Sequence, residues 1–230
     1  MKLSILVPIY NEEASALRAL DLALDVVYPC EVEFIVVDDG STDGTPRLLA
    51  DVSDKRVQVF THNRNQGKGA AIATAVGHAT GDYLIPLDAD LEYDARDIPS
   101  LLQPVLEGRA EVVYGNRTFG SHSAYSFWYV VGNKAMTLAA NVMFNCYISD
   151  LETCFKLIPA DLYRTMKIRS RGFGMEAEVT GKLLRRRIRP YDVPISYTAR
   201  SREQGKKITW RDGVAALGIL ARERIRRRPR

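Results

Sequence analysis

The first half of the chain alternates short apolar runs with longer amphipathic segments. Five runs have the length and continuous apolar character of strands buried on both faces: residues 3–9, 32–38, 56–62, 82–88 and 110–116. The segments between them have helical character: residues 12–27, 45–52, 69–79 and 97–108. Strands that are buried on both faces and joined by helices predict an α/β fold. We expect a doubly wound, mainly parallel sheet with helices on both faces.

The second half is less regular. Residues 123–148 form a long apolar segment with several aromatic residues, 176–187 predict a helix and 189–197 a strand. Residues 208–228 predict an amphipathic helix, interrupted near Gly213 and basic at its end. No linker, repeat or clear boundary divides the chain, so its 230 residues are expected to form a single domain.

Charge is distributed unevenly along the chain. Residues 1–163 carry 12 Lys and Arg against 22 Asp and Glu, a net charge of −10, whereas residues 164–230 carry +14. This basic last third predicts an anionic partner such as a phosphate or a lipid headgroup. A solvated basic helix at the C-terminus is the alternative. Nucleic acid is excluded as a partner, because the terminal run ARERIRRRPR has no aromatic residues among its arginines.

The expected lack of targeting signals and the few, scattered cysteines both predict a cytoplasmic protein. No window of 18 consecutive apolar residues occurs, and strand-like sequence begins at Lys2, so neither a spanning helix nor a signal peptide is expected. Three scattered cysteines without a C-x-x-C pair predict reduced thiols and no cysteine metal site.

Five acidic residues crowd the end of the apolar run 82–88: Asp88, Asp90, Glu92, Asp94 and Asp97. Like charges this close raise one another's pKa, so a positive partner is expected. Ligands of doubly wound sheets bind beyond the carboxyl ends of the strands, where this cluster lies. A calcium loop is excluded, because its sixth position is Tyr93 and its twelfth is Pro99. Two carboxylates one residue apart can instead hold a hard divalent cation that binds a diphosphate.

A second acidic pair, Asp38-Asp39, ends the run 32–38 and can accept hydrogen bonds from a ribose or a base. A nicotinamide dinucleotide is nevertheless excluded. The glycine-rich turn that it requires after the first strand is replaced by PIYNEEA, and GKGAAI at 67–72 lacks the third glycine.

Seven motifs together resemble a known family. LVPIYNE, VVDDGSTDGT, GKGAA, PLDADLEYD, DLETCFKL, GFGMEAEVTGKL and VPISYTARSREQGKKITWRDG follow one another and cover nearly the whole chain. They resemble inverting family-2 glycosyltransferases of the GT-A fold, in particular the dolichol-phosphate mannose synthase and polyprenyl-phosphate glucose synthase group. Glu92 stands where eukaryotic and archaeal mannose synthases have Gln, and Cys154 where Gly is usual. Bacterial relatives often carry both, so the sugar stays open.

The resemblance implies a metal-dependent, inverting hexose transfer. The donor would be GDP-mannose or UDP-glucose, and the acceptor a polyprenyl or dolichyl phosphate, which gives a β-linked lipid sugar phosphate. Residues 1–117 would bind the nucleotide sugar, 118–207 the acceptor, and 208–230 an anionic membrane surface. The protein would then associate peripherally with the inner face of the membrane. A helix there would place Leu217 and Leu220 on one side and six arginines between Arg222 and Arg230 beyond them.

The resemblance also implies roles for single residues. The base and ribose would be lined by Pro8, Tyr10, Glu12, Val37 and Asp39. Asp88, Ala89 and Asp90 would approach the ribose and a Mg²⁺ or Mn²⁺ ion, with Glu92 helping at the metal. Arg117 and Arg202 would face the donor diphosphate or the acceptor phosphate, with a surface ion pair as the alternative for each. Lys134 is a looser match to an acceptor-phosphate contact.

The acceptor decides whether a base is needed. A phosphomonoester has a second pKa near ~6 and is ionised at pH 7, so it needs no strong general base. This agrees with the absence of histidine from every motif, since His62, His78 and His122 all lie outside them. A soluble transferase acting on a hydroxyl of a glycan or small molecule would need a carboxylate base. Asp150 and Glu176 are the candidates, with helix capping or loop structure as the alternative. The segment 123–148 would bind the prenyl chain, unless it is a packed core helix.

Overall fold

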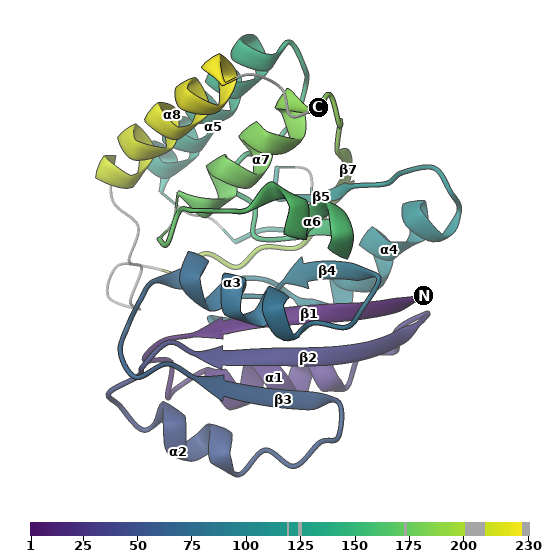
Figure 1. Cartoon of the computed structure of the whole chain (residues 1–230), viewed down its shortest axis with the longest axis vertical. Helices are drawn as coiled ribbons and strands as arrows, with labels where there is room; N and C mark the ends of the chain where they lie inside the picture. The colour runs from purple at the N-terminus through teal and green to yellow at the C-terminus, as the bar shows by residue number, and fades with distance from the viewer. Residues whose placement is uncertain (119, 124–125, 173, 201–209, 227–230) are drawn as a thin grey trace.

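A computed structural model describes residues 1–118, 120–123, 126–172, 174–200 and 210–226. Its strands form one seven-stranded sheet in the order β3-β2-β1-β4-β6-β5-β7 (Figure 1). The strands are β1 (Lys2–Ile9), β2 (Glu31–Asp38), β3 (Val57–Thr61), β4 (Tyr83–Pro86), β5 (Val113–Asn116), β6 (Lys156–Pro159) and β7 (Tyr191–Pro194). β3, β2, β1 and β4 pair in parallel, and so do β5 and β7.

Helices cover both faces of this sheet. They are α1 (Ala16–Leu24), α2 (Thr45–Ala50), α3 (Lys68–His78), α4 (Ile98–Leu106), α5 (Phe127–Phe144), α6 (Ala160–Met166), α7 (Met175–Arg185) and α8 (Trp210–Ile225), with a 3₁₀ turn η1 (Ala95–Asp97) before α4. One core cluster joins α1 and α4 to Ile5 and Val7 of β1, and a second joins α3, α6 and α7 to Leu6. Because successive strand residues point to opposite faces, burial of both faces produces the continuous apolar runs.

The expected doubly wound, mainly parallel sheet is confirmed, and β6 is its antiparallel strand. β6 lies between β4 and β5 and runs antiparallel to both. The sequence reasoning missed it because KLIP has only four residues and begins with a lysine. Lys156 is nevertheless buried, and its ammonium donates to the carbonyl oxygens of Leu151 (3.0 Å) and Thr153. Those backbone acceptors replace the water that a lysine normally requires.

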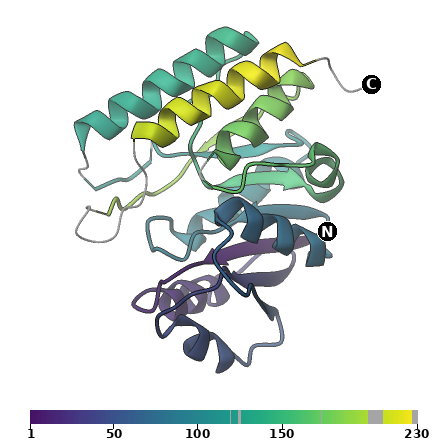
Figure 2. The same cartoon turned by 60° about the vertical axis from the view of Figure 1, so that its left-hand side comes forward.

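A third layer of helices lies beyond the β5–β7 end of the sheet. α5 and α8 pack against each other and against α7, as Figure 2 shows. The expected interruption near Gly213 is wrong, since α8 continues through this residue. A Cβ at Gly213 would lie 3.3 Å from the sulfur of Met136, so the glycine allows close packing against α5. No helix in the described ranges is long and apolar enough to span a bilayer.

Candidate active site

The carboxyl ends of β1, β2 and β4 lie side by side at one end of the strands, on the left in Figure 1; we call this side of the sheet the carboxyl edge. The loop after β1 carries the partly buried Tyr10 and Glu12. The end of β2 carries Asp38 and Asp39, and the turn after β4 carries the acidic cluster. Parallel pairing therefore brings three separate motifs to one edge, where ligands of doubly wound folds bind.

Asp39 is a fixed anchor at this edge and is 2% exposed. Its two carboxylate oxygens accept hydrogen bonds from the backbone N–H groups of Gln66 (2.9 Å) and Gly67 (2.7 Å). The ring of His62 reaches Asp39 through Nδ1 at 2.6 Å and the hydroxyl of Thr74 through Nε2 at 2.9 Å. These contacts hold the loop that enters α3, so His62 has a structural place.

Asp88 is paired with Lys68, the first residue of α3. The ammonium of Lys68 lies 2.8 Å from Asp88 Oδ2 and 2.9 Å from Glu176 Oε1, at the start of α7. Burial acts to lower the pKa of Lys68, but Asp88 and the neighbouring groups hold it well above its ordinary value. Lys68 therefore links the predicted metal ligand Asp88 to the predicted base Glu176. The sequence reasoning gave it no role, although it lies within GKGAA.

Asp90 and Glu92 face the guanidinium of Arg200. Nη2 lies 2.8 Å from Asp90 Oδ2, Nη1 lies 3.2 Å from Glu12 Oε2, and Nε lies 3.7 Å from Glu92 Oε1. Leu91, between the two acids, has a φ of +61°, a left-handed conformation that is unusual for leucine. The sequence reasoning missed Arg200 because its partners are distant along the chain.

The electrostatics of Asp90 favour a cation. Burial, and then the carboxylates of Asp88 and Glu92, raise the pKa of Asp90 to about 7. A nearby positive charge stabilises the ionised form of such a group. Hard carboxylate oxygens suit Mg²⁺ or Mn²⁺, and Arg200 is the positive group that the structure places against them. Among the described residues no three metal-ligating side chains already form a cluster, since Asp88 faces Lys68 while Asp90 and Glu92 face Arg200.

Arg117, predicted to face a phosphate, forms a buried bidentate pair with Asp150. Its Nε and Nη2 lie 2.6 and 2.8 Å from the two carboxylate oxygens, and Asn133 donates to the same carboxylate at 2.9 Å. The guanidinium also lies 4.9 Å from the ring centre of Tyr197. Burial acts to raise the pKa of Asp150, but Arg117 lowers it. Because a general base works best with a pKa near the operating pH, this environment suits an anchor for Arg117 better than a base.

Glu152 has the property of a base, and sequence reasoning gave it no role. Burial, and then the charge of Glu176, raise the pKa of Glu152 to about 7. One carboxylate oxygen on each of these two acids has no hydrogen-bond partner among the described residues. A buried carboxyl group that titrates near neutral pH marks candidate catalytic positions. The signal in the sequence was only an acid between apolar residues in DLETCFKL.

The remaining predicted residues have varied places. Pro8 and Val37 are register partners on β1 and β2, and the Val37 side chain is fully buried in the core. Ala89 is buried within the turn after β4. Lys134 is exposed on α5. Arg202 lies outside the described residues.

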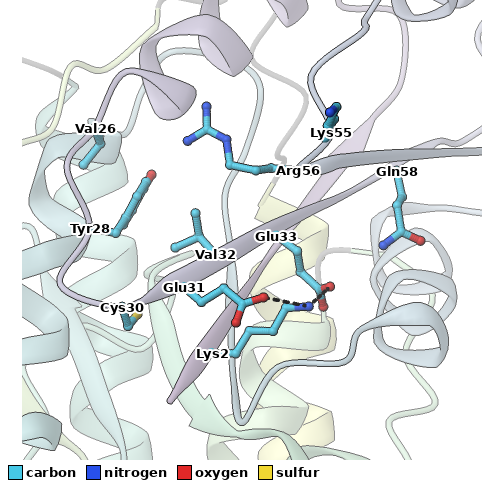
Figure 3. Close-up of a pocket in the computed structure, with 10 residues that line it drawn as sticks. All are labelled: Lys2, Val26, Tyr28, Cys30, Glu31, Val32, Glu33, Lys55, Arg56 and Gln58. Carbon is cyan, nitrogen blue, oxygen red and sulfur yellow. Dashed lines mark ion pairs between the residues drawn. The ribbon is translucent and has the colours of Figure 1, made fainter.

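A hollow at the opposite edge of the sheet, drawn in Figure 3, is a different feature. Three of its charged side chains come from the amino ends of β1 and β2 and pair with one another, since Lys2 lies 2.8 Å from Glu33 and 3.6 Å from Glu31. Lys55 and Arg56, which precede β3, also line it. Burial opposes ionisation of Glu33, but Lys2 and Ser4 hold its pKa at about 2. None of the motif residues at the carboxyl ends lines this hollow.

Comparison with known proteins gives the family. The sequence model "Glycosyl transferase family 2" matches residues 4–167. The undecaprenyl-phosphate 4-deoxy-4-formamido-L-arabinose transferase of Proteus mirabilis is 38% identical over 112 residues, which are 46% of this chain and 34% of that protein. The low-salt glycan biosynthesis hexosyltransferase Agl6 of Haloferax volcanii is 27% identical over 205 residues, 87% of this chain and 49% of that protein. The chain thus spans between a third and a half of the length of these two relatives.

The glycosyltransferase AglJ of Haloferax volcanii is 30% identical over 224 residues, 97% of this chain and 71% of that protein. Among solved structures, glucosyl-3-phosphoglycerate synthase from Mycobacterium tuberculosis with Mn²⁺, UDP and phosphoglyceric acid superposes with a TM-score of 0.72 at 19% identity, over 97% of this chain and 78% of that one. Residues 1–349 of S. aureus TarS with UDP-GlcNAc superpose with a TM-score of 0.66 at 18% identity, over 97% of this chain and 66% of that one. These likenesses confirm the expected GT-A fold. Because the family model covers most of its length, the chain belongs to glycosyl transferase family 2 and is a glycosyltransferase.

Proposed function

We propose that this glycosyltransferase moves a hexose from a UDP- or GDP-linked donor to a polyprenyl phosphate, with inversion and with the help of Mg²⁺ or Mn²⁺. The observation that carries the proposal is the acidic edge at the end of β4. There Asp88 and Asp90 are compensated by side-chain cations, Lys68 and Arg200. A partly buried group of carboxylates that attracts positive charge suits a cation bound to a diphosphate.

The donor would lie across the ends of β1, β2 and β4. Pro8, Tyr10 and Glu12 come from the loop side of β1, and Asp39 fixes the facing loop. Val37 has no exposed side chain, so it would contact the nucleotide through its backbone. Asp88, Asp90 and Glu92 would hold the cation, with Ala89 close to the ribose. When bound, the cation would neutralise charge on the departing diphosphate.

The acceptor proposal rests on relatives and on the weak case for a base at Asp150. One relative is named as a transferase to undecaprenyl phosphate. A phosphate acceptor is already ionised, so its oxygen can attack without a base. Arg117 and Arg202 would neutralise the charges of the acceptor or the diphosphate, and Lys134 would assist from α5. Asp150 fixes the orientation of the Arg117 guanidinium, whose Nε and Nη2 lie 2.6 and 2.8 Å from its carboxylate oxygens. Residues 1–117 would thus serve the donor and 118–207 the acceptor, within one sheet.

A hydroxyl acceptor is the second candidate function. Glu152 supports it, because its buried carboxyl group has a pKa of about 7 and lies near Glu176. Either acid could take the proton from an attacking hydroxyl. Glu176 is held by Lys68 at 2.9 Å, which leaves Glu152 as the better base of the two.

We propose that α5, rather than the leucines of α8, supplies the apolar contact with the membrane. Leu220 is fully buried between α5, α7 and α8, while Leu217 is partly exposed, so these leucines do not share one lipid-facing side. α5 instead exposes apolar residues along one side, at the helical spacing of Phe127, Val131, Leu138 and Val142. Arg222 and Arg224 are exposed on the neighbouring α8, and Arg227, Arg228 and Arg230 lie outside the described residues. We propose that this face binds anionic membranes peripherally, at the cytoplasmic side.

The membrane test uses substitutions rather than truncation, because removal of residues 222–230 would also delete Glu223. That side chain is fully buried and lies 3.1 Å from Arg185 of α7. Phe127→Ser with Leu138→Ser should weaken binding to phosphatidylglycerol vesicles several-fold, and Arg222→Gln with Arg224→Gln should reduce its salt dependence. Vesicle binding that is unchanged in both double variants would contradict this face.

The function itself is tested by a transfer screen. UDP-glucose and GDP-mannose are offered with a polyprenyl phosphate, or with a sugar hydroxyl acceptor, in the presence of Mg²⁺ or Mn²⁺. We expect transfer to the phosphate and a β anomeric signal by NMR of the product. Transfer to the hydroxyl alone would select the second candidate, and an α product from an α donor would refute inversion.

A further inference from the structure

We infer that Arg200 is an internal counter-ion that occupies the proposed cation site and is displaced when a divalent cation binds. The inference rests on the proposed function in one respect, since it places the cation at Asp90 and Glu92. It adds that Arg200 competes with the metal ion for the carboxylate oxygens of Asp90 and Glu92. Metal binding must therefore rearrange the backbone around Arg200.

The guanidinium gathers carboxylates from two strand ends. Glu12 comes from the loop after β1, and Asp90 and Glu92 come from the turn after β4. Each carboxylate makes one contact with the guanidinium, at 3.2, 2.8 and 3.7 Å respectively. Carboxylates are also the ligands that a hard cation prefers, so a metal ion that drew these oxygens closer together would take the place of the guanidinium.

The contacts of Arg200 are those of a replaceable partner. Its Nε is buried without a hydrogen-bond acceptor among the described residues, and it makes no bidentate pair. Arg117 offers the contrast, since its Nε and Nη2 both bind Asp150 in a fork. Fork-shaped pairs are the stronger arrangement for arginine, so Arg200 is the more easily displaced of the two.

Glu92 couples displacement of Arg200 to the backbone. Its Oε1 accepts the backbone N–H of Arg200 at 3.0 Å, and its Oε2 accepts the hydroxyl of Tyr197 at 2.6 Å. Its carbonyl oxygen accepts the N–H of Thr198 at 2.9 Å. If Glu92 turns Oε1 to a metal ion, this oxygen releases the backbone N–H of Arg200. Metal binding at the donor side would therefore free the backbone at Arg200 on the acceptor side.

The test measures Mn²⁺ binding by electron paramagnetic resonance, without nucleotide. Arg200→Gln should bind Mn²⁺ about tenfold more tightly than the wild type, a coupling of ordinary size between two ligands of one site. Arg96→Gln is the matched control, because Arg96 pairs with Asp94 in the same acidic run but contacts none of the three carboxylates. The control should bind as the wild type does. Equal or weaker binding by Arg200→Gln would overturn the inference.

A second measurement does not depend on the variant folding. In the wild type, added Mn²⁺ should accelerate hydrogen exchange at the amide of Arg200 several-fold, because this N–H donates to the carboxylate of Glu92. Unchanged exchange at saturating Mn²⁺ would overturn the inference while leaving the metal site in place. If no form of the protein binds Mn²⁺, with or without UDP, the cation part of the proposed function fails together with this inference.

Discussion

Asp39 follows β2 and Asp90 follows β4, the strands on either side of β1, yet their charges are compensated in opposite ways. Asp39 is met by two backbone N–H groups and the ring of His62, all within 2.9 Å. Asp90 accepts one backbone N–H, from Glu92, and is otherwise met by Arg200, which is 110 residues away in the chain. Backbone donors cannot leave without unfolding the loop, whereas a side-chain cation can rotate away. The comparison separates an acid that builds the site from an acid that is available to a ligand.

The largest expected effect is on activity, and it comes from substitution of Asp90, the acid that is available to a ligand. Asp90→Ala should lower transfer by about 10³-fold, the loss seen when one key electrostatic group is removed from a transition state. Stability should change little, because Arg200 keeps Glu12 and Glu92 as partners. Turnover and urea unfolding of the same preparation check both statements. Full activity of this variant, or of the wild type in excess chelator, would contradict a role for the metal.

Asp39→Ala should do the reverse and destabilise the fold. The substitution leaves two buried N–H groups and His62 without their acceptor, and unsatisfied buried donors cost 1–3 kcal/mol each. We expect the free energy of unfolding to fall by about 3 kcal/mol, measured by urea denaturation. If Asp39→Ala and Asp90→Ala lose equal stability, the two acids do not differ as described.

Glu152 adds a third type, an acid that lacks full compensation. Its pKa is raised to about 7, so the folded state holds a proton that the unfolded state releases near pH 4. Stability of the wild type should therefore fall as the pH rises from about 4 to 7. Glu152→Gln should reduce this slope by about 1–3 kcal/mol across that window and leave the part that comes from Asp90, whose pKa is also raised to about 7. Denaturant titrations at pH 5 and pH 8 measure the slope, and identical slopes would refute the raised pKa.

The smallest effect sharpens the structural side. His62→Phe keeps a ring but removes both nitrogens, which lie 2.6 Å from Asp39 and 2.9 Å from Thr74. The two lost hydrogen bonds together should cost about 1–2 kcal/mol of stability. Donor hydrolysis should stay near the wild-type rate, because the two backbone donors still hold Asp39. A large loss of hydrolysis at unchanged stability would give His62 a catalytic place instead.

The fold could be predicted from the sequence where a pattern reports burial directly. Both faces of β1, β2 and β4 are buried, so their residues form apolar runs with helices between them. β6 and α6 could not be found, because a four-residue strand with a buried lysine lacks this pattern. The interruption expected at Gly213 was wrong because packing against Met136 outweighs the low helix propensity of glycine.

The candidate site could be predicted only in part, for a related reason. Asp39, Asp88 and Asp90 follow apolar strands directly, so position alone marks them. Arg200 and Lys68 were missed because their significance comes from partners that are distant in the chain, and no local pattern encodes those partners. Arg117 and Asp150 were both named, but their mutual pairing depends on a contact across 33 residues.

The place of β6 has a consequence for synthesis on the ribosome. β4 ends at Pro86 and its neighbour β6 begins at Lys156, so about 70 residues must emerge before β4 can pair on that side. At ~5–20 residues per second, the free edge of β4 waits roughly 3.5–14 s for its neighbour. An apolar strand edge that stays open for seconds is a site for mispairing with another chain. We therefore expect nascent chains shorter than about 160 residues to need chaperone protection that the finished protein does not.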